Sequence, residues 1–403
     1  MPFRSKLPDV ETTIFTVISR RAAEVGALNI GQGFPDFPID PRLAQHVAAA
    51  MAEGRNQYAH GDGLPELRQA IAGKLARAHG IVADPVGGIT VTCGGTEALF
   101  SAIQAVVHPG DEVIVFDPAY DAYEPAVRLA GGRCVRIPLQ PPTFTIDFER
   151  VRESLSPRTR LLLLNNPHNP ACVVHGRDVL DELARLLRDT EVLVLSDEVY
   201  EHCVFDGRAH ASVLAHPELR ERAFAVFSFG KTLHVTGWRV GCCVAGPALM
   251  AEFRKVHQFN TFSIATPLQL GIARYIEEDP SSWSGLADFF GRKRDRLTAG
   301  LAGSGLRVLQ TQGTYFQLLD YSALSDLPDV EFADRLIREG GVALIPLSPF
   351  YRSRPRLQLL RICFAKREDT LDLAARRLRE FAAGLAASPS AAPAGAQTPW
   401  ATA

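Results

Sequence analysis

The sequence predicts an α/β fold built around a doubly wound, mostly parallel sheet with helices on both faces. Short apolar runs rich in Val, Ile, Leu and Phe recur along the chain, as expected for buried strands. Amphipathic stretches lie between several of them, with apolar residues three and four positions apart. Residues 97–107 and 179–189 are predicted as covering helices. Seven runs are predicted as strands: residues 89–92, 113–116, 134–138, 161–164, 192–195, 224–227 and 240–244.

The chain is long enough to form more than one lobe. Its 403 residues are 46% hydrophobic, which is sufficient for a large core divided into two or three lobes. From about Trp283 a charged helical stretch, residues 289–301, leads into a second, smaller α/β portion that ends near Leu385. The residues after it are mostly Ala, Pro and Ser, so a disordered tail is expected there.

Charge and cysteine content narrow the class of protein. The 43 basic and 45 acidic residues give a formal charge of -2, which argues against nucleic acid or an anionic membrane as partner. The seven cysteines are scattered and lack a C-x-x-C pair, which argues against a disulfide framework and a zinc site, and no metal is expected. The sequence shows neither an apolar signal core at its start nor a run of membrane-spanning length. We therefore expect an unexported, cytoplasmic protein.

The segment from Ser228 to Gly241 combines an amine, a hydroxyl and a guanidinium. Lys231 follows an apolar run and can form a Schiff base with a carbonyl cofactor, while Arg239 can bind a phosphate through its fork of donors. Together they indicate pyridoxal phosphate. A phosphate-binding P-loop is excluded by spacing, because its first glycine would fall on Ala225. An ordinary strand-turn-strand with surface charges remains open on this segment alone.

Ligands of such sheets bind beyond the carboxyl ends of the strands, so polar residues at those ends are candidate site residues. Around Gly95 and Thr96 a predicted strand stops at two glycines and a helix begins, which leaves free N–H groups and a hydroxyl for an anion. An unliganded helix cap is the alternative. In combination with Ser228 and Arg239, this turn is predicted to form a phosphate cup.

Asp197 emerges directly from a very apolar predicted strand. A carboxylate in that position needs a partner, and a protonated pyridine nitrogen would supply one and keep the ring able to accept electrons. Tyr200 could then reach the phenolic oxygen of the same ring. The alternatives are a helix-capping aspartate and a tyrosine that only packs.

Two further groups lie near predicted strand ends. Asn169 stands in a rigid Asn-Pro-His-Asn-Pro turn and could bind the phenolic oxygen, although a plain Asx turn is equally compatible. His168, between two prolines, is interpreted as a turn residue and not as a base. Arg361 interrupts an apolar strand, and a buried arginine requires an anion. That anion is either the α-carboxylate of a substrate or a structural acidic residue.

Taken together, these motifs resemble fold type I pyridoxal phosphate enzymes, specifically class I/II aminotransferases, from about Thr12 to Phe381. The branch to which they are most similar contains the bacterial methionine aminotransferases and the kynurenine aminotransferases. The motifs that carry this resemblance are residues 29–37 (NIGQGFPDF), Asn56-Gln-Tyr58 with Gly61 and Gly63, residues 118–125 (PAYDAYEP) and residues 345–348 (IPLS).

The resemblance implies the domain organisation. It comprises an N-terminal segment (1–45) that joins the small domain, a large cofactor-binding domain with a seven-stranded sheet (46–288) and a small C-terminal domain (289–385). Residues 386–403 are left as the expected disordered tail.

The resemblance also implies site roles. Lys231 corresponds to the Schiff-base lysine and Asp197 to the partner of the pyridine nitrogen. Tyr200 and Asn169 correspond to partners of the phenolic oxygen, and Arg361 to the group that binds the substrate carboxylate. The phosphate cup comprises Gly95, Thr96, Ser228 and Arg239.

Three further positions complete the implied site. Tyr120 falls where an aromatic ring stacks on the cofactor, and Gly33 where backbone approaches the substrate. Tyr58 falls where a hydroxyl reaches the phosphate of the neighbouring subunit, which implies a homodimer. One departure is that the family's Asn-Pro-Thr-Gly is Asn169-Pro-Ala-Cys172 here, which changes the hydrogen bonding of that turn but keeps the amide.

The expected activity is transfer of an amino group from an L-amino acid to a 2-oxo acid by a ping-pong mechanism. The residues expected to line the substrate pocket are aromatic, and no second arginine is evident for a side-chain carboxylate. This favours methionine, aromatic amino acids, kynurenine or glutamine as substrates. The expected lining residues are Phe34, Tyr120, Phe262 and Phe350.

Three rivals remain at this point. A cysteine S-conjugate β-lyase would use the same lysine and cofactor. A regulator would need an additional DNA-binding module, for which the match leaves no room. A noncatalytic binding protein would have little reason to retain Lys231, Asp197, Arg239 and Arg361 together.

Overall fold

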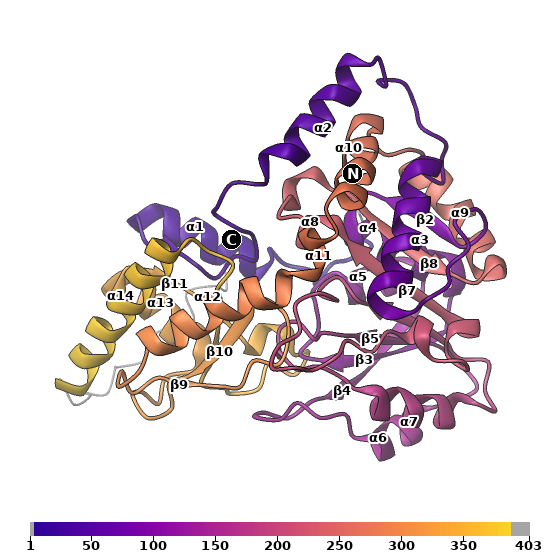
Figure 1. Ribbon diagram of the computed structural model, residues 1–403. Helices are drawn as coiled ribbons and strands as arrows, with labels where there is room; N and C mark the ends of the chain where they lie inside the picture. The colour runs from indigo at the N-terminus through magenta and orange to yellow at the C-terminus, as the bar shows by residue number, and fades with distance from the viewer. Residues whose placement is uncertain (1–3, 388–403) are drawn as a thin grey trace.

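The computed structural model describes residues 4–387 and contains a seven-stranded sheet in the larger part of the molecule (Figure 1). The strand order is β2-β8-β7-β6-β5-β3-β4. β8 runs antiparallel to both of its neighbours, and the other neighbouring pairs are parallel. The bounds are β2 (Ile89–Thr92), β3 (Glu112–Asp117), β4 (Arg133–Pro138), β5 (Thr159–Asn165), β6 (Leu193–Asp197), β7 (Ala223–Ser228) and β8 (Gly241–Ala245).

All seven predicted strands are present, which confirms the predicted α/β class. Most of them extend beyond the apolar run that predicted them, because backbone pairing continues through polar end residues. Asn165, for example, still pairs with Asp197 at the ends of β5 and β6. The apolar pattern thus marks the buried middle of a strand but not its end.

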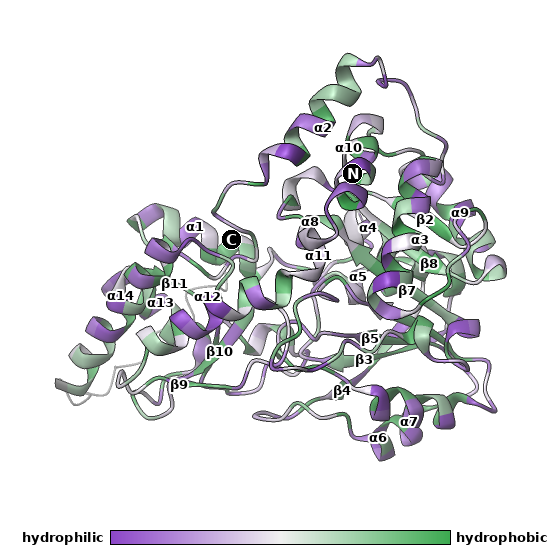
Figure 2. Cartoon of the chain, in the orientation of Figure 1, coloured by the Kyte–Doolittle hydropathy of each residue, from purple (hydrophilic) through white to green (hydrophobic). Residues whose placement is uncertain are grey.

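The sheet is covered on both faces, as the alternation of its side chains shows. Val113 and Val115 of β3 contribute to one buried cluster, whereas Ile114 and Phe116 contribute to another. The first cluster is completed by α4 (Gly94–Val106), α5 (Tyr123–Leu129) and α9 (Pro247–Asn260). The helices that contribute to the second include α3 (Pro65–His79), α6 (Phe148–Ser154), α7 (Arg177–Leu187) and α10 (Thr266–Glu278). Apolar and polar residues alternate along these helices, while the strands between them are mainly apolar (Figure 2).

The smaller part of the molecule is built around a four-stranded antiparallel sheet with the order β12-β13-β10-β9. Its strands are β9 (Arg307–Val308), β10 (Phe316–Asp320), β12 (Ile345–Pro346) and β13 (Leu359–Cys363). The helical segments of this part are α12 (Leu286–Gly300), α13 (Asp329–Arg335), the π-helical turn η4 (Leu336–Gly340) and α14 (Glu368–Ala387).

The N-terminal segment contacts this smaller part. β1 (Leu28–Asn29) pairs in parallel with β11 (Val342–Ala343), and α1 (Ile14–Val25) packs beside it. The next helix, α2 (Pro41–Ala52), packs instead on α10 of the larger part. The chain therefore crosses between the two parts close to residues 30–40. The remaining short elements are α8 (Phe229–Thr232), α11 (Ser281–Ser284), η1 (Val213–Ala215), η2 (Arg220–Arg222), η3 (Thr236–Trp238) and η5 (Ser348–Phe350).

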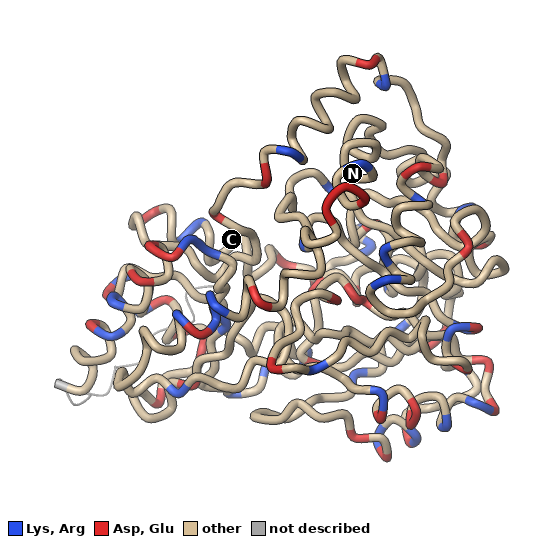
Figure 3. Tube along the Cα trace, in the orientation of Figure 1, with Lys and Arg blue, Asp and Glu red and all other residues tan. Residues whose placement is uncertain are grey.

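Three sequence expectations bear on the surface and the chain end. All seven cysteines are free. Basic and acidic residues are interspersed along the trace (Figure 3), and no helix within residues 4–387 has the length and apolarity needed to cross a bilayer. α14 extends to Ala387, so it includes the first two residues of the segment expected to form a tail; the rest of that prediction, residues 388–403, lies outside the described residues.

Candidate active site

The predicted site residues gather where β5, β6 and β7 end. These neighbouring strands are parallel, so their carboxyl ends lie at one edge of the sheet. Asn165, Asp197 and Ser228 are their last residues. The amide nitrogen of Asn165 donates to the backbone oxygen of Asp197 at 2.8 Å, and its Oδ1 accepts the N–H of Asn169 at 2.7 Å. Two of the predicted residues are thereby fixed relative to each other.

Lys231 lies in the short helix α8, directly after β7. Its Nζ is 3.4 Å from the carbonyl oxygen of Gly33 and lies 5.7 and 5.6 Å from the ring centroids of Tyr200 and Tyr315. Burial lowers the pKa of this amine to about 8. A larger share of it is thus neutral at physiological pH than for an exposed lysine, which favours its action as a nucleophile and as a base.

Asp197 is 5% exposed, and burial raises the pKa of its carboxyl to about 6. Oδ2 accepts a hydrogen bond from the hydroxyl of Tyr123 at 2.7 Å, whereas Oδ1 has a long contact of 3.4 Å with the N–H of Val199. The residues that follow form a turn and not a helix, so Asp197 is not a helix cap. A buried carboxylate with one weakly bonded oxygen has capacity for a further donor or cation.

Arg361 is buried at 1% exposure in β13. Its Nη1 donates to Oδ1 of Asn169 at 2.5 Å and its Nη2 to the carbonyl of Gly31 at 3.2 Å, while Nε is buried without a partner. The ring of Phe316 lies 3.8 Å beneath the guanidinium carbon. Within residues 4–387 no Asp or Glu forms an ion pair with this arginine. The structural salt bridge considered from the sequence is therefore not present in this part of the chain.

Several of the residues predicted to bind a phosphate lie where α4 begins. Gly94 has φ +71°, and a Cβ there would lie 2.6 Å from Nη2 of Arg239, so the guanidinium packs directly on the glycine backbone. Gly95 and Thr96 follow in the first turn of α4, whose free N–H groups favour an anion. Arg239 itself adopts φ +54°, and among residues 4–387 no carboxylate pairs with it. Its exposed guanidinium is available to a phosphate.

The predicted aromatic residues fall into two groups. Tyr120, Tyr200 and Phe350 lie around the strand ends; the Phe350 ring is 5.5 Å from the Arg361 guanidinium, and Tyr120 contacts Tyr123 edge to face. Tyr58 and Phe262 pair with each other at 5.3 Å and are 83% and 48% exposed. No contact of this second group with Lys231 or Asp197 is found among the described residues. Phe34, beside Gly33, is 46% exposed.

Comparison with known proteins identifies the family. The family model for aminotransferase class I and II matches residues 25–378. The chain belongs to the class I and II aminotransferases. It is 51% identical to a methionine aminotransferase of Escherichia coli over 94% of this chain and 98% of that protein. It is also 33% identical to kynurenine--oxoglutarate transaminase 3 of Rattus norvegicus, over 93% of this chain and 89% of that protein.

A solved structure supports the same assignment. The crystal structure of a methionine aminotransferase from Escherichia coli matches with a TM-score of 0.93 and 50% identity, and covers 94% of this chain and all of that one (100%). The predicted family, its fold and its enzyme class are thus confirmed. These relatives are named aminotransferases or transaminases, so the β-lyase alternative is not favoured.

Sequence reasoning missed three residues of this aminotransferase that touch the predicted ones. They are Tyr123, which bonds Asp197, Tyr315, which donates to Gly33 at 2.6 Å, and Phe316 beneath Arg361. Tyr123 stands inside the quoted motif of residues 118–125, so the motif itself was the available signal. Tyr315 and Phe316 precede or open an apolar strand, where an aromatic residue normally indicates core packing.

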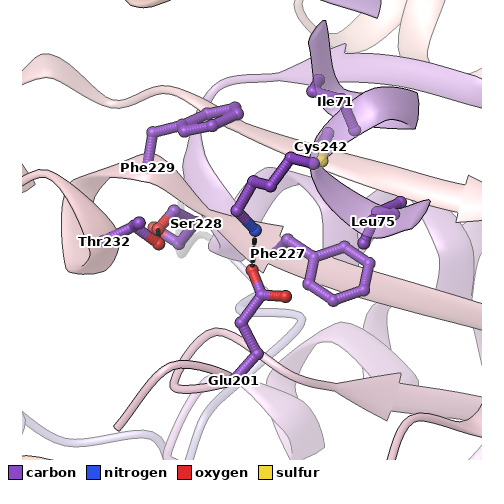
Figure 4. A pocket seen from close by; sticks show the side chains of 9 residues that line it. Ile71, Leu75, Glu201, Phe227, Ser228, Phe229, Thr232 and Cys242 are labelled. Atoms are coloured by element: carbon purple, nitrogen blue, oxygen red, sulfur yellow. Dashed lines mark hydrogen bonds and ion pairs between the residues drawn. The ribbon is translucent and has the colours of Figure 1, made fainter. Parts of the chain in front are cut away.

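A buried ion pair supports the loop that carries Tyr200. Lys74 of α3 donates a hydrogen bond to the carboxylate of Glu201, which also accepts one from Nε2 of His79 at 2.7 Å (Figure 4, dashed line for the lysine). Burial alone would raise the pKa of Glu201, but the charge of Lys74 lowers it well below its usual value. His79, Glu201 and His202 place three possible metal-ligating atoms within 4.8 Å of one another. The ammonium of Lys74 on the same carboxylate would repel a metal cation there, so we assign this cluster a structural role.

Proposed function

We propose that this aminotransferase binds pyridoxal 5'-phosphate at the strand ends and takes methionine or another large, apolar L-amino acid as donor. The observation that supports the proposal most directly is the burial of Arg361 without a compensating anion among the described residues. Arg361 has a buried guanidinium without an acidic partner in residues 4–387 and with an unsatisfied Nε. Burying such a charge without a compensating anion is unfavourable. The α-carboxylate of an amino acid has the charge and the two acceptors that such a group binds.

The residues present fit the cofactor. Gly95, Thr96, Ser228 and Arg239 would hold its phosphate, and Asp197 would face its pyridine nitrogen through Oδ1. Tyr200 and Asn169 would bind its phenolic oxygen, and Tyr120 would stack on its ring. When bound, pyridoxal phosphate supplies an electron-accepting ring that stabilises negative charge at the substrate α-carbon.

The chain itself supplies binding and proton transfer. In this proposal Arg361 and the amide of Asn169 fix the substrate carboxylate, which orients the α-hydrogen toward Lys231. The neutral amine of Lys231 would remove the α-proton, hold it on Nζ and deliver it to the carbon that carried the aldehyde of the cofactor. The buried rings of Tyr200 and Tyr315 beside this amine limit the access of water to it.

The donor preference rests on the aromatic lining. The rings of Phe316 and Phe350 lie against Arg361, and Phe34 directly follows Gly33, whose carbonyl oxygen contacts Lys231. Aromatic surroundings of this kind favour a thioether or an aromatic side chain over a carboxylate. The relatives named for methionine and kynurenine are consistent with this preference.

The assembly is a separate part of the proposal. The ring pair Tyr58 and Phe262 is exposed, as is Phe259 three positions before Phe262, at 85% exposure, and a second copy would cover such apolar side chains. We propose a homodimer in which Tyr58 contributes to the partner's phosphate site. We also propose a cytoplasmic location, in agreement with seven free cysteines.

The test is a half-reaction with defined products. Purified protein is loaded with pyridoxal phosphate, mixed with stoichiometric L-methionine without any oxo acid, and followed by its visible spectrum and by mass spectrometry of the products. Formation of one equivalent of the methionine oxo acid and of pyridoxamine phosphate supports the proposal. Failure to bind the cofactor refutes it, and a preference for aspartate over methionine refutes the donor class.

Variants make the test specific. Lys231→Ala should abolish turnover, whereas Lys255→Ala, on a side chain that is 69% exposed, should leave it unchanged. Equal losses in both variants would contradict the role of Lys231.

A further inference from the structure

The segment from Gly31 to Phe37 passes between the predicted carboxylate-binding group and the predicted catalytic amine. Its Gly31 carbonyl accepts from Arg361 at 3.2 Å, and its Gly33 carbonyl accepts from Tyr315 at 2.6 Å and from Lys231 at 3.4 Å. Phe34 therefore directly follows, in the sequence, the residue whose carbonyl contacts the predicted catalytic amine. Its ring is 46% exposed, unlike the buried rings of Tyr315 and Phe316.

Lys366 contacts Phe34 through its ammonium group. The lysine is 2% exposed and follows β13, the strand that contains Arg361. Its Nζ donates to the carbonyl oxygen of Phe34 at 2.6 Å and lies 4.3 Å from the centroid of the Phe34 ring. One ammonium thus contacts both the backbone and the side chain of the same residue.

The surroundings make this arrangement unusual for a purely structural lysine. Within residues 4–387, Lys366 forms no ion pair with an acidic side chain. Burying an unpaired cation is unfavourable, and an apolar residue of similar length would be accommodated more easily. The stabilising interactions of the Lys366 ammonium are one hydrogen bond and one cation–π contact, and both involve Phe34.

The segment does not depend on Lys366 for its path. Before Phe34, Tyr315 binds the Gly33 carbonyl. After it, the Asp36 carboxylate accepts from the N–H of Arg367 and from the hydroxyl of Thr370 at 2.7 Å. Because both flanks are anchored independently, removal of the ammonium should free the Phe34 ring without unfolding the segment.

We propose that Lys366 is a specificity-determining positioning residue, which holds the Phe34 ring against the apolar side chain of the amino donor. The proposal rests on the function proposed above and deepens it. It requires that Lys366 acts through Phe34 and that its effect scales with the length of the donor side chain. Alanine, whose methyl group is too short to reach the ring, serves as the insensitive donor.

The test compares Lys366→Met, Lys366→Arg, Phe34→Ala and the double variant Lys366→Met/Phe34→Ala as holoenzymes. Single-turnover half-reactions with L-methionine, L-phenylalanine and L-alanine give rate and apparent affinity separately. For Lys366→Met we expect an approximately tenfold loss in kcat/KM with methionine, mainly through KM, since a cation–π contact and a hydrogen bond are removed. With alanine the change should stay within about twofold, since alanine makes no contact with the ring. Lys366→Arg, which keeps the cation and a donor, should recover most of the loss.

The double variant decides whether the effect passes through Phe34. If it does, Lys366→Met should add no further loss once Phe34 is replaced. Equal losses with methionine and alanine, or full additivity of the two substitutions, would overturn the proposal while leaving the enzyme an active aminotransferase. A wild-type protein inactive with all three donors would instead overturn the proposed donor class, and this inference with it.

Discussion

The hydroxyl of Tyr123 donates a 2.7 Å hydrogen bond to Oδ2 of Asp197, across 74 positions in the sequence. Tyr123 lies in the first turn of α5, after β3, whereas Asp197 ends β6. The bond leaves Oδ1 as the weakly bonded oxygen, with only the long contact to Val199. Tyr123 therefore determines which carboxylate oxygen faces the proposed pyridine nitrogen, and it helps to keep a buried carboxyl ionised.

The first prediction follows from that bond. Burial raises the pKa of Asp197 to about 6, and the Tyr123 hydrogen bond opposes this rise. Tyr123→Phe should therefore raise the pKa further, so that activity on the acid side is lost at a higher pH than in the wild type. We expect the acid limb of kcat/KM to move upward by about one pH unit, since a lost hydrogen bond to a charged group corresponds to roughly that shift. An unchanged pH profile with a uniformly lower rate would contradict this role.

The second prediction concerns the amine of Lys231 before cofactor is added. Burial lowers its pKa from 10.5 to about 8. Because the folded state holds this proton less firmly than the unfolded state, the neutral amine accumulates in folded apoprotein as pH rises through 8. The rate of reductive methylation at Lys231, measured by peptide mass spectrometry, should increase up to about pH 8 and then level. A rate that still climbs at pH 10 would show an ordinary amine.

The third prediction concerns Arg361, which has no acidic partner within residues 4–387. Arg361→Gln should keep a hydrogen-bond donor toward Asn169 but remove the positive charge. The KM for the amino-acid substrate should therefore rise by about a hundredfold or more, as for loss of one side of a buried charged pair. Arg361→Lys keeps the charge but loses the bidentate geometry and should be intermediate. Steady-state kinetics with methionine measures both. A variant with a normal KM but reduced kcat would argue that another residue binds the carboxylate.

Sequence reasoning located the strand middles and the polar residues at their ends, because buried parallel strands have a strong apolar pattern and ligands bind at their carboxyl edge. It did not find Tyr123, Tyr315 or Lys366. In the sequence, Tyr123 and Tyr315 are interpreted as core residues, and Lys366 is interpreted as a charged surface residue. Only the folded chain brings them to Asp197, Gly33 and Phe34, since these contacts join segments 74, 282 and 332 positions apart.

The fourth prediction concerns His257, which links the start of α4 to the loop that contains Tyr58. Its Nδ1 lies 3.1 Å from a carboxylate oxygen of Glu97 and its Nε2 lies 3.0 Å from the carbonyl oxygen of Gly61. Both partners only accept hydrogen bonds, so both ring nitrogens must carry a hydrogen, which requires the imidazolium. In agreement, burial lowers the pKa of His257 but the hydrogen bond to Glu97 outweighs it, and the pKa is raised above 6.5.

The sign of the pH effect follows from that direction. The folded state binds this proton more tightly than the unfolded state, so the stabilisation is fully present below pH 6.5 and is lost as pH rises through the raised pKa. His257→Gln should therefore destabilise the protein more at pH 6 than at pH 9 in denaturant unfolding, by about 1 kcal/mol at the lower pH. His60→Gln, in the same loop but with a side chain that is 70% exposed, is the matched control and should show little difference between the two pH values. An equal destabilisation by His257→Gln at both pH values would mean that the ring acts by packing alone, whereas the expected difference would show that one proton secures the Gly61 carbonyl and hence the loop from which Tyr58 extends.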